Sequence, residues 1–439
     1  MRVRLDYGKT GLMAELPDAN LIGILGLSPA PPLTAPTEAV ETALAAPIGT
    51  LPLARLAQGK HDAVIVICDI TRPVPNTTLL PPILRILEAS GIPADRITIL
   101  IATGTHRPNE GEELHQLIGA EIASRYNVVN HDSHDRGAQR YLGVSPNGVP
   151  VRLDSVYCDA DLKITVGLIE PHFMAGYSGG RKLIMPGVAD FETVQRWHCP
   201  RFLESPKATN GIVEGNPVHA ESLAIARMMP PDLILDVTLD ESNRITGVFA
   251  GDLEQAWLTG VAFAAQHVRA AAPQLADIVV TSCAGYPLDA TFYQAVKGMV
   301  GALPVVKEGG TIILAAECAE GIGSPLFTRT LLEAGDLEKF VAHISQPDVF
   351  LPEEWQVEEL AKVARKAEIY CIAGGISAQL LADCFVQPAP TIETALQSAF
   401  ARHGQNASVL AIPRGPYVIP YIDSAYLCDT PTHEAISKV

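Results

Sequence analysis

The sequence contains no hydrophobic run as long as the roughly 20 residues that a membrane-spanning helix requires. Its first residues, 1–7 (MRVRLDY), also lack the apolar stretch of a signal peptide. No CxxC pair occurs among the eight cysteines, which are at positions 68, 158, 199, 283, 318, 371, 384 and 428. Several lie in apolar segments, as Cys68 does in 64–68 (VIVIC). We therefore expect reduced core thiols in a cytoplasmic protein without a membrane partner, and neither a disulfide framework nor a cysteine zinc site.

Basic residues are scarce in this chain. There are 32 Lys and Arg residues against 49 Asp and Glu residues, a formal net charge of −17. Nucleic-acid binding needs a basic surface that releases counterions from the phosphates, and the sequence has no such stripe. It also has no Lys/Arg run suited to an anionic membrane surface. A small-molecule substrate is therefore expected, and no nucleic-acid or membrane partner.

Strand and helix patterns alternate along the 439 residues. The strongest strand signals are β-branched runs without polar alternation, at residues 63–68, 97–102, 163–168, 277–281, 311–316, 368–373 and 408–412. Such runs are typical of parallel strands that are buried on both faces. Helical patterns, such as 79–88 and 358–365, lie between several of them. The sequence predicts an α/β protein of two domains, each with a mainly parallel sheet flanked by helices.

A domain break is predicted near residues 271–276 (AAPQLA), just before a new strand pattern begins. We expect an N-terminal cofactor-binding domain over residues 1–272 and a C-terminal α/β domain over 275–404. The remaining segment, 405–439, contains one more strand-like run and is expected to return to the first domain and complete it.

Polar residues follow two of the predicted strands, where open α/β sheets bind ligands. The first strand is followed by Asp69 and by Arg72, whose planar fork suits a carboxylate or phosphate. An Asp/Arg surface pair beside a turn explains the same residues equally well. After the second strand, His106 lies in 103–108 (TGTHRP), a position suited to a general base. The alternative is an incidental histidine at a helix start.

The most informative segment is 170–187 (EPHFMAGYSGGRKLIMPG). Its glycines at 176, 179 and 180 allow the backbone to approach a ligand closely, although the spacing of a Walker loop is absent. Lys182 lies in an apolar setting that favours a nucleophile or covalent anchor. His172 precedes the loop, and His198 is a candidate metal ligand. A single histidine is often a satisfied core residue, but three histidines and a lysine beside Gly or Pro favour a functional site.

The C-terminal half offers two further candidates. Segment 286–298 (YPLDATFYQAVKG) opens a helix on which Tyr293 and Lys297 share a face, with Gln294 beside them. An amphipathic helix with a solvated lysine is an equal alternative. Trp355 is expected in an acidic loop, where it either walls a pocket or packs.

Together these segments resemble the nickel-dependent lactate racemase family. The matching pieces, which extend from about residue 60 to 360, are 69–75 (DITRPVP), 103–108, 171–187, His198, 286–298 and Trp355-Gln356. The resemblance implies a racemase or epimerase of 2-hydroxy acids, with two domains and the active site in the cleft between them. It also implies a nickel-pincer nucleotide as cofactor and separate enzymes that mature it.

The resemblance assigns roles to individual residues. Lys182 would hold the nucleotide covalently, and His198 would ligate the nickel. His106 and His172 would be the two acid/base groups. The remaining cofactor contacts would be Asp69, Thr71, Ser178 and Gly179. The substrate contacts would be Arg72, Tyr293, Gln294, Lys297 and Trp355.

The chemistry of inversion agrees with two imidazoles. Removing hydride from a 2-hydroxy acid carbon avoids a carbanion beside a carboxylate, and the planar 2-oxo acid can take hydride back on either face. One histidine would then accept the hydroxyl proton of one enantiomer, and the other histidine would accept that of its mirror image. The substrate itself is left open among lactate, malate and larger sugar acids.

Two alternatives remain at this stage. One is a lyase in which Lys182 forms a Schiff base with a keto acid, which leaves the histidines unexplained. The other is a non-catalytic protein that binds a nucleotide or phosphorylated metabolite on the loop 176–180.

Overall fold

The computed structural model describes residues 1–28, 30–346 and 349–423; Cys428 lies outside them. The chain forms two compact units. The larger unit comprises residues 30–267 together with 341–346 and 349–355, and the smaller unit comprises 1–28, 268–340 and 356–423. In the described part of the chain, no helix combines the length and the apolar character needed to cross a bilayer.

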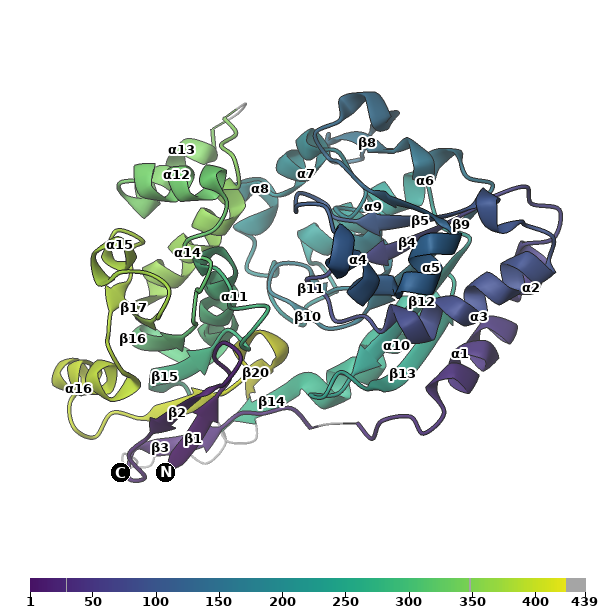
Figure 1. The fold of residues 1–439 in the computed structure, drawn as a ribbon. Helices are drawn as coiled ribbons and strands as arrows, with labels where there is room; N and C mark the ends of the chain where they lie inside the picture. Colours follow the sequence, from purple (N-terminus) through teal and green to yellow (C-terminus); the bar gives the residue numbers. More distant parts are fainter. Residues whose placement is uncertain (29, 347–348, 424–439) are drawn as a thin grey trace, which may run out of the picture. The chain divides into compact units, whose positions relative to one another are not determined.

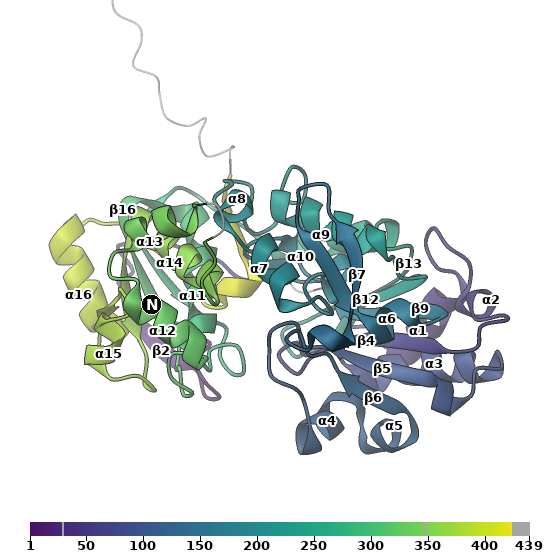
Figure 2. The same cartoon turned by 90° about the horizontal axis from the view of Figure 1, so that it is seen from above.

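The larger unit is built on a six-stranded sheet in the order β13-β12-β9-β4-β5-β6 (Figures 1 and 2). Its strands are β4 (Ala63–Cys68), β5 (Ile97–Ala102), β6 (Asn127–Asn130), β9 (Leu162–Leu168), β12 (Leu233–Leu239) and β13 (Ile245–Gly251). All neighbours are parallel except β12 and β13. The predicted strand runs 63–68 and 97–102 coincide with β4 and β5, and the run 163–168 lies within β9.

One face of this sheet is covered by α1 (Pro36–Ala45), α2 (Leu53–Leu56) and α3 (Asn76–Ala89). Ile65 and Ile67 of β4 point into this layer, and Val64 and Val66 point to the opposite face because side chains alternate along a strand. All four side chains are buried, which accounts for the continuous apolar run in the sequence.

Further helices of the larger unit follow the strands: α4 (Gly111–Ile118), α5 (Ala120–Arg125), α6 (Ser155–Asp159), α7 (Phe191–Trp197), α8 (Pro200–Leu203), α9 (Pro217–Met228) and α10 (Gln255–Val268). A hairpin of β7 (Gln139–Val144) and β8 (Pro150–Asp154) precedes α6. The short strands β10 (Pro171–His172) and β11 (Gly176–Tyr177) and the turn η3 (Gly180–Leu183) form the loop after β9.

The smaller unit has a second six-stranded sheet, parallel throughout, in the order β18-β17-β16-β15-β19-β3. Its strands are β3 (Leu21–Ile24), β15 (Ala276–Ser282), β16 (Val306–Ala315), β17 (Ala367–Ile372), β18 (Gln387–Pro388) and β19 (Val409–Ile412). Helix α16 (Ile392–His403) and the hairpin β1 (Arg2–Leu5)–β2 (Leu12–Glu15) cover one face of it (Figure 2). Helix α11 (Phe292–Ala302) packs on the side to which Leu314 points.

The expected return of 405–439 to the first domain is wrong for its described part. Strand β19 pairs with β15 and with β3, in the interior of the second sheet. The side chain of Asn20 donates to the carbonyls of Gln405 and Ala407 beside this junction. Residues 419–422 form β20 (Ile419–Ile422), which pairs with β14 (Arg269–Ala272) of the same unit.

Two other segments also belong to a different unit from the one that the sequence predicts. Residues 1–28, assigned to the first domain by the sequence, supply β1, β2 and β3 to the smaller unit. Residues 341–346 and 349–355, assigned to the second domain, belong to the larger unit. Trp355 at their end is not in a loop, because it lies in the first turn of α14 (Glu354–Lys366).

Candidate active site

Three adjacent strands bring the predicted residues of the larger unit to one edge of its sheet. Strands β9, β4 and β5 are neighbours and run parallel, so their carboxyl ends meet. Asp69 directly follows β4, the turn that carries His106 follows β5, and the segment that starts at Glu170 follows β9. The order of the strands therefore gathers residues that are up to about a hundred positions apart in sequence.

Asp69 holds the ring of His106, a role that the sequence analysis did not assign to it. Its Oδ2 lies 2.7 Å from His106 Nδ1, and its Oδ1 accepts from the Thr71 hydroxyl over 2.6 Å. Asp69 is only 5% exposed. Burial by itself raises the pKa of Asp69, but the charge and hydrogen bond of His106 and the Thr71 hydroxyl outweigh this and lower it. The ionised Asp69 carboxylate thus orients His106. Thr71, which was predicted to contact the cofactor, donates a hydrogen bond to that carboxylate.

Arg72 is paired with Glu170 across the two neighbouring strand ends. Arg72 Nε lies 2.9 Å from Glu170 Oε1, and both side chains are largely buried. The pair fixes the direction of the guanidinium, which is what a bidentate carboxylate site requires. No role was predicted for Glu170 from the sequence, although its position shortly after a predicted strand was a signal for one.

His172 is oriented by the backbone of its own turn. Strands β10 and β11 pair His172 with Gly176, and residues 173–175 form the turn between them. The N–H groups of Met174 and Ala175 both donate to His172 Nδ1, each over 3.2 Å. The ring also stacks on Phe173, with centroids 5.1 Å apart.

The glycines of this loop are required by the protein's own atoms. A Cβ on Gly176 would lie 2.3 Å from the carbonyl oxygen of Ile212, and one on Gly180 would lie 2.8 Å from the Trp257 ring. On Gly179 it would lie 2.9 Å from Asp236 Oδ2. All three glycines have positive φ. Close packing of the loop on the chain is by itself sufficient to require glycine at these positions, and the approach of a ligand to them stays a prediction.

Ser178, predicted to contact the cofactor, is also engaged within the chain. Its hydroxyl donates to the Leu168 carbonyl over 2.7 Å and accepts from the Glu170 N–H over 3.1 Å. These bonds close the loop onto the end of β9. The contacts of Ser178 and Gly179 with a cofactor stay a prediction.

Arg181 stabilises the loop that follows β9. Its Nη2 donates to the carbonyls of Ala175 and Tyr177, each over 2.9 Å, and its guanidinium lies 4.1 Å from the Trp257 ring centroid. The residue is 1% exposed. Burial lowers the pKa of Arg181 to about 9, which the nearby Asp236 carboxylate partly opposes. The cation is thus enclosed by the loop that it stabilises.

Lys182 and His198 both lie beside the Trp197 indole, and His198 also lies beside that of Trp355. Lys182 Nζ lies 5.1 Å from the Trp197 ring centroid. The His198 ring has its centroid 4.1 Å from that of Trp197 and 4.9 Å from that of Trp355. Burial holds the pKa of His198 well below its usual value, and the Lys182 ammonium lowers it further. The structure therefore brings together three of the predicted cofactor and substrate residues.

His198 is suited to binding a group that the chain itself does not provide. It follows α7, whose N-terminus is capped by Asp190 through the Thr193 N–H. It is 8% exposed, and its Nδ1 has no hydrogen-bond partner in the described part of the chain. A neutral, buried imidazole nitrogen of this kind suits a metal ligand.

No set of three or more His, Cys, Asp or Glu side chains within residues 1–28, 30–346 and 349–423 is arranged to hold a metal ion. The buried His198 Nδ1 without a partner in the described residues, with the Lys182 amine nearby, fits the nickel-pincer nucleotide that the resemblance implies.

The predicted substrate residues of the smaller unit lie on α11. Thr291 caps this helix, and Tyr293, Gln294 and Lys297 occupy its first turns, as the spacing predicted. The Gln356 side chain donates to the Tyr293 carbonyl, and the Tyr293 ring meets Phe327 edge-on with centroids 5.0 Å apart. These contacts hold the start of α11.

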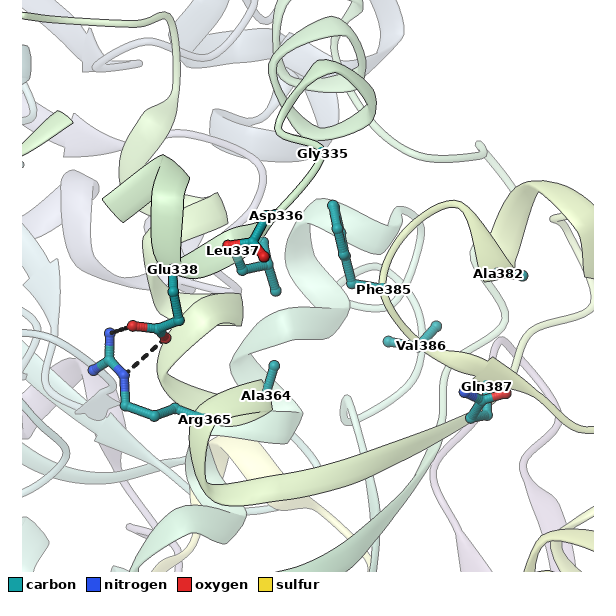
Figure 3. Close-up of a pocket in the computed structure, with 10 residues that line it drawn as sticks. All are labelled: Gly335, Asp336, Leu337, Glu338, Ala364, Arg365, Ala382, Phe385, Val386 and Gln387. Carbon is teal, nitrogen blue, oxygen red and sulfur yellow. Dashed lines mark hydrogen bonds and ion pairs between the residues drawn. The ribbon is translucent and has the colours of Figure 1, made fainter. Parts of the chain in front are cut away.

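The smaller unit also has a surface cavity of about 660 Å³ that is unrelated to these residues (Figure 3). It lies among α13 (Leu337–Ile344), α14, α15 (Ala378–Ala382) and β18. Its charged side chains include Arg365 and Glu338, which pair with each other over 2.9 Å. No predicted site residue lines it, so it is not the candidate active site.

Comparison with known proteins identifies relatives over nearly the whole chain. Residues 7–211 match the family model of the lactate racemase N-terminal domain, and residues 271–420 match that of the C-terminal domain. The lactate racemase of Lactiplantibacillus plantarum is 37% identical over 421 residues, which cover 95% of this chain and 99% of that protein. The lactate racemase of Thermoanaerobacterium thermosaccharolyticum is 36% identical, with 95% and 98% covered.

Solved structures agree with these matches. The lactate racemase apoprotein from Thermoanaerobacterium thermosaccharolyticum superposes with a TM-score of 0.90 at 35% identity, covering 96% of this chain and all of that one. A Thermotoga maritima protein shares the fold, with a TM-score of 0.70 at 18% identity over 89% of this chain and 99% of its own.

Proposed function

Because the chain belongs to the lactate racemase family, and is therefore a racemase and an isomerase, we propose that it inverts the Cα of a 2-hydroxy acid. Lactate is the first candidate substrate, since both curated relatives are lactate racemases. The observation that carries the proposal is the grouping of Lys182, His198 and two tryptophans in the unit that also carries the Asp69–His106 pair.

The cofactor we propose is the nickel-pincer nucleotide, attached to Lys182 and ligated by His198. When bound, it supplies a hydride acceptor for the substrate Cα. The Trp197 and Trp355 indoles lie beside His198, and Trp197 also lies beside Lys182, so they limit the access of water, which protects a reactive centre from hydrolysis. Loading of this cofactor by separate maturation enzymes is part of the same proposal, as is a cytoplasmic location.

His106 would accept the substrate hydroxyl proton at Nε2. Its Nδ1–H is held by Asp69, and the carboxylate stabilises the imidazolium that forms on proton uptake. His172 is proposed as the second acid/base group, for the opposite enantiomer. With both groups assigned, one protein can process either hand of the acid.

Arg72 would hold the substrate carboxylate in a direction fixed by Glu170. Tyr293, Gln294, Lys297 and Trp355 are proposed as further substrate contacts. A carboxylate held in place leaves the hydroxyl end free to reorient, which inversion requires. Malate and sugar acids remain candidate substrates of the same site.

The test uses protein that is produced together with the maturation enzymes of a lactate racemase. Holoprotein is incubated with single-enantiomer 2-hydroxy acids, and the loss of optical purity is followed. Intact mass should reveal an adduct and metal analysis should find nickel, and Lys182→Ala should abolish the adduct and racemisation. Lys207→Ala is the matched control, because Lys207 is an exposed lysine of the same unit. A fully active Lys182→Ala protein would refute the proposal.

Two further assays separate the other functions considered. Borohydride reduction with a keto acid in metal-free protein would trap a Schiff base on Lys182 if the chain were a lyase. Ligand binding without exchange of the substrate Cα hydrogen would indicate a binding protein.

A further inference from the structure

We propose that the chain holds its two acid/base histidines in opposite neutral tautomers, so that His106 presents a lone pair at Nε2 and His172 presents an N–H at Nε2. Only the description of these rings as acid/base groups rests on the proposed function. The tautomers themselves follow from hydrogen bonds within the larger unit.

The tautomer of His106 is set by Asp69. The Asp69 carboxylate is ionised and can only accept hydrogen bonds. Its Oδ2 lies 2.7 Å from His106 Nδ1, so that nitrogen must carry the hydrogen. In the neutral ring the lone pair is then at Nε2. Thr71 holds the other carboxylate oxygen and keeps Asp69 turned toward the ring.

The tautomer of His172 is set by the opposite kind of partner. The N–H groups of Met174 and Ala175 converge on His172 Nδ1 at 3.2 Å each. A backbone N–H can only donate, so Nδ1 must keep its lone pair and the hydrogen of the neutral ring lies on Nε2. The pairing of His172 with Gly176 closes this turn.

The two rings therefore respond differently to an added proton. A proton at Nε2 of His106 yields an imidazolium that still donates from Nδ1 to Asp69. An imidazolium at His172 would carry a hydrogen at Nδ1, where two backbone N–H groups already point, and both bonds would be lost. Asp69 and the 174–175 backbone thus act as positioning groups that make His106 the ready base and His172 the ready hydrogen-bond donor.

This asymmetry has a kinetic consequence for the holoprotein. An enantiomer whose hydroxyl meets His106 can transfer its proton at once: the O–H bond breaks and an N–H bond forms at Nε2. For the enantiomer whose hydroxyl contacts His172, proton transfer can occur only after that ring has changed its tautomer. Because two enantiomers have equal free energy, kcat/KM is the same in both directions, and the difference appears in the first turnover.

The decisive measurement is spectroscopic and needs no activity. The full chain is labelled with ¹⁵N-histidine, and long-range couplings between ring carbon-bound protons and ring nitrogens are recorded at mildly alkaline pH. His106→Gln and His172→Gln assign the two rings. We expect the Nδ1–H pattern for His106 and the Nε2–H pattern for His172. The same tautomer in both rings, or the reverse assignment, overturns the proposal.

Variants of the carboxylates give the matched comparison. In Asp69→Asn, the Nδ1–H form of His106 should no longer be favoured, and the His172 spectrum should be unchanged. Asp132→Asn, at an exposed carboxylate, should alter neither spectrum. If Asp69→Asn does not fold, the spectrum of the unaltered chain still decides the question. A His106 tautomer that is unaffected by a folded Asp69→Asn protein contradicts the role of Asp69.

Single-turnover racemisation of each lactate enantiomer by holoprotein completes the test. We expect unequal first-turnover rates, and a loss of roughly 10²-fold or more for Asp69→Asn with partial recovery in Asp69→Glu. Equal first-turnover rates contradict the asymmetry. A chain with the expected tautomers but no racemisation of any 2-hydroxy acid refutes the proposed function and leaves the tautomer assignment intact.

Discussion

Asp236 Oδ2 accepts a hydrogen bond from the Gly180 N–H over 2.8 Å, two residues before Lys182. Asp236 lies in β12 and is fully buried. Burial raises the pKa of Asp236 to about 7, although the Gly180 N–H and Arg181 act in the opposite direction. The loop that carries Lys182 is therefore tied to a carboxyl group that titrates near neutral pH.

This carboxyl group predicts a pH-dependent stability. A carboxyl whose pKa is raised from 3.8 to about 7 in the folded state binds more protons there than in the unfolded chain. Its contribution to the free energy of unfolding therefore falls as the pH rises across that interval. Asp236→Asn keeps an acceptor for Gly180 and removes the titration. Urea unfolding at a series of pH values should show a weaker decline for the variant, and identical slopes would contradict this.

Two glycines with similar backbone angles should differ in their tolerance of alanine. Gly176 (φ +78°) would place a Cβ 2.3 Å from a backbone oxygen, whereas Gly148 (φ +82°) has no atom within 4 Å of that position. Gly148→Ala should cost only the left-handed backbone strain, about 1–2 kcal/mol. Gly176→Ala should cost about 1–3 kcal/mol more, because the Ile212 carbonyl is backbone and shifts only with the chain. Equal losses in urea unfolding would show that the loop yields freely.

A second histidine–carboxylate pair should matter for folding. His131 Nδ1 lies 2.8 Å from Asp154 Oδ2, and Nε2 lies 2.9 Å from the Ala189 carbonyl. Both partners are acceptors, so the buried ring fills both bonds only when it carries both hydrogens. His131→Asn leaves Asp154 buried without its partner and should lower the free energy of unfolding by about 3–5 kcal/mol.

The matched control for this change is His134→Asn, at an exposed position three residues away. It should change the free energy of unfolding by about 0.5 kcal/mol or less. Similar losses for the two variants would mean that the His131–Asp154 pair contributes little.

Arg72 should be required for substrate recognition with little effect on folding. Arg72→Lys removes the planar fork, and a charge-assisted hydrogen bond is worth about 1.5–3 kcal/mol. We therefore expect kcat/KM for lactate to fall roughly 10–100-fold in holoprotein. Arg107→Lys is the control, because Arg107 is exposed and pairs with Glu113 over 2.7 Å. An unchanged kcat/KM in Arg72→Lys would remove Arg72 from the substrate site.

The sequence by itself determined the central strands and the positions just beyond them. The runs 63–68 and 97–102 are apolar on both sides because both faces of the sheet are covered, so a local pattern was sufficient. Asp69, His106 and the segment after 168 were found as polar residues after such strands. The run 233–239 (LILDVTL) was missed because Asp236 interrupts it.

Only the tertiary structure decided which distant residues meet. The sequence predicted the strand run 408–412, which contains β19, but not the strands with which β19 pairs, since hydrogen bonds between strands more than a hundred residues apart leave no local periodicity. The same holds for Asp69, whose partner is 37 residues away, and for Gly176, whose conformation is explained by a carbonyl at residue 212. Local patterns report how a segment is buried, whereas partner choice depends on the packing of the whole unit.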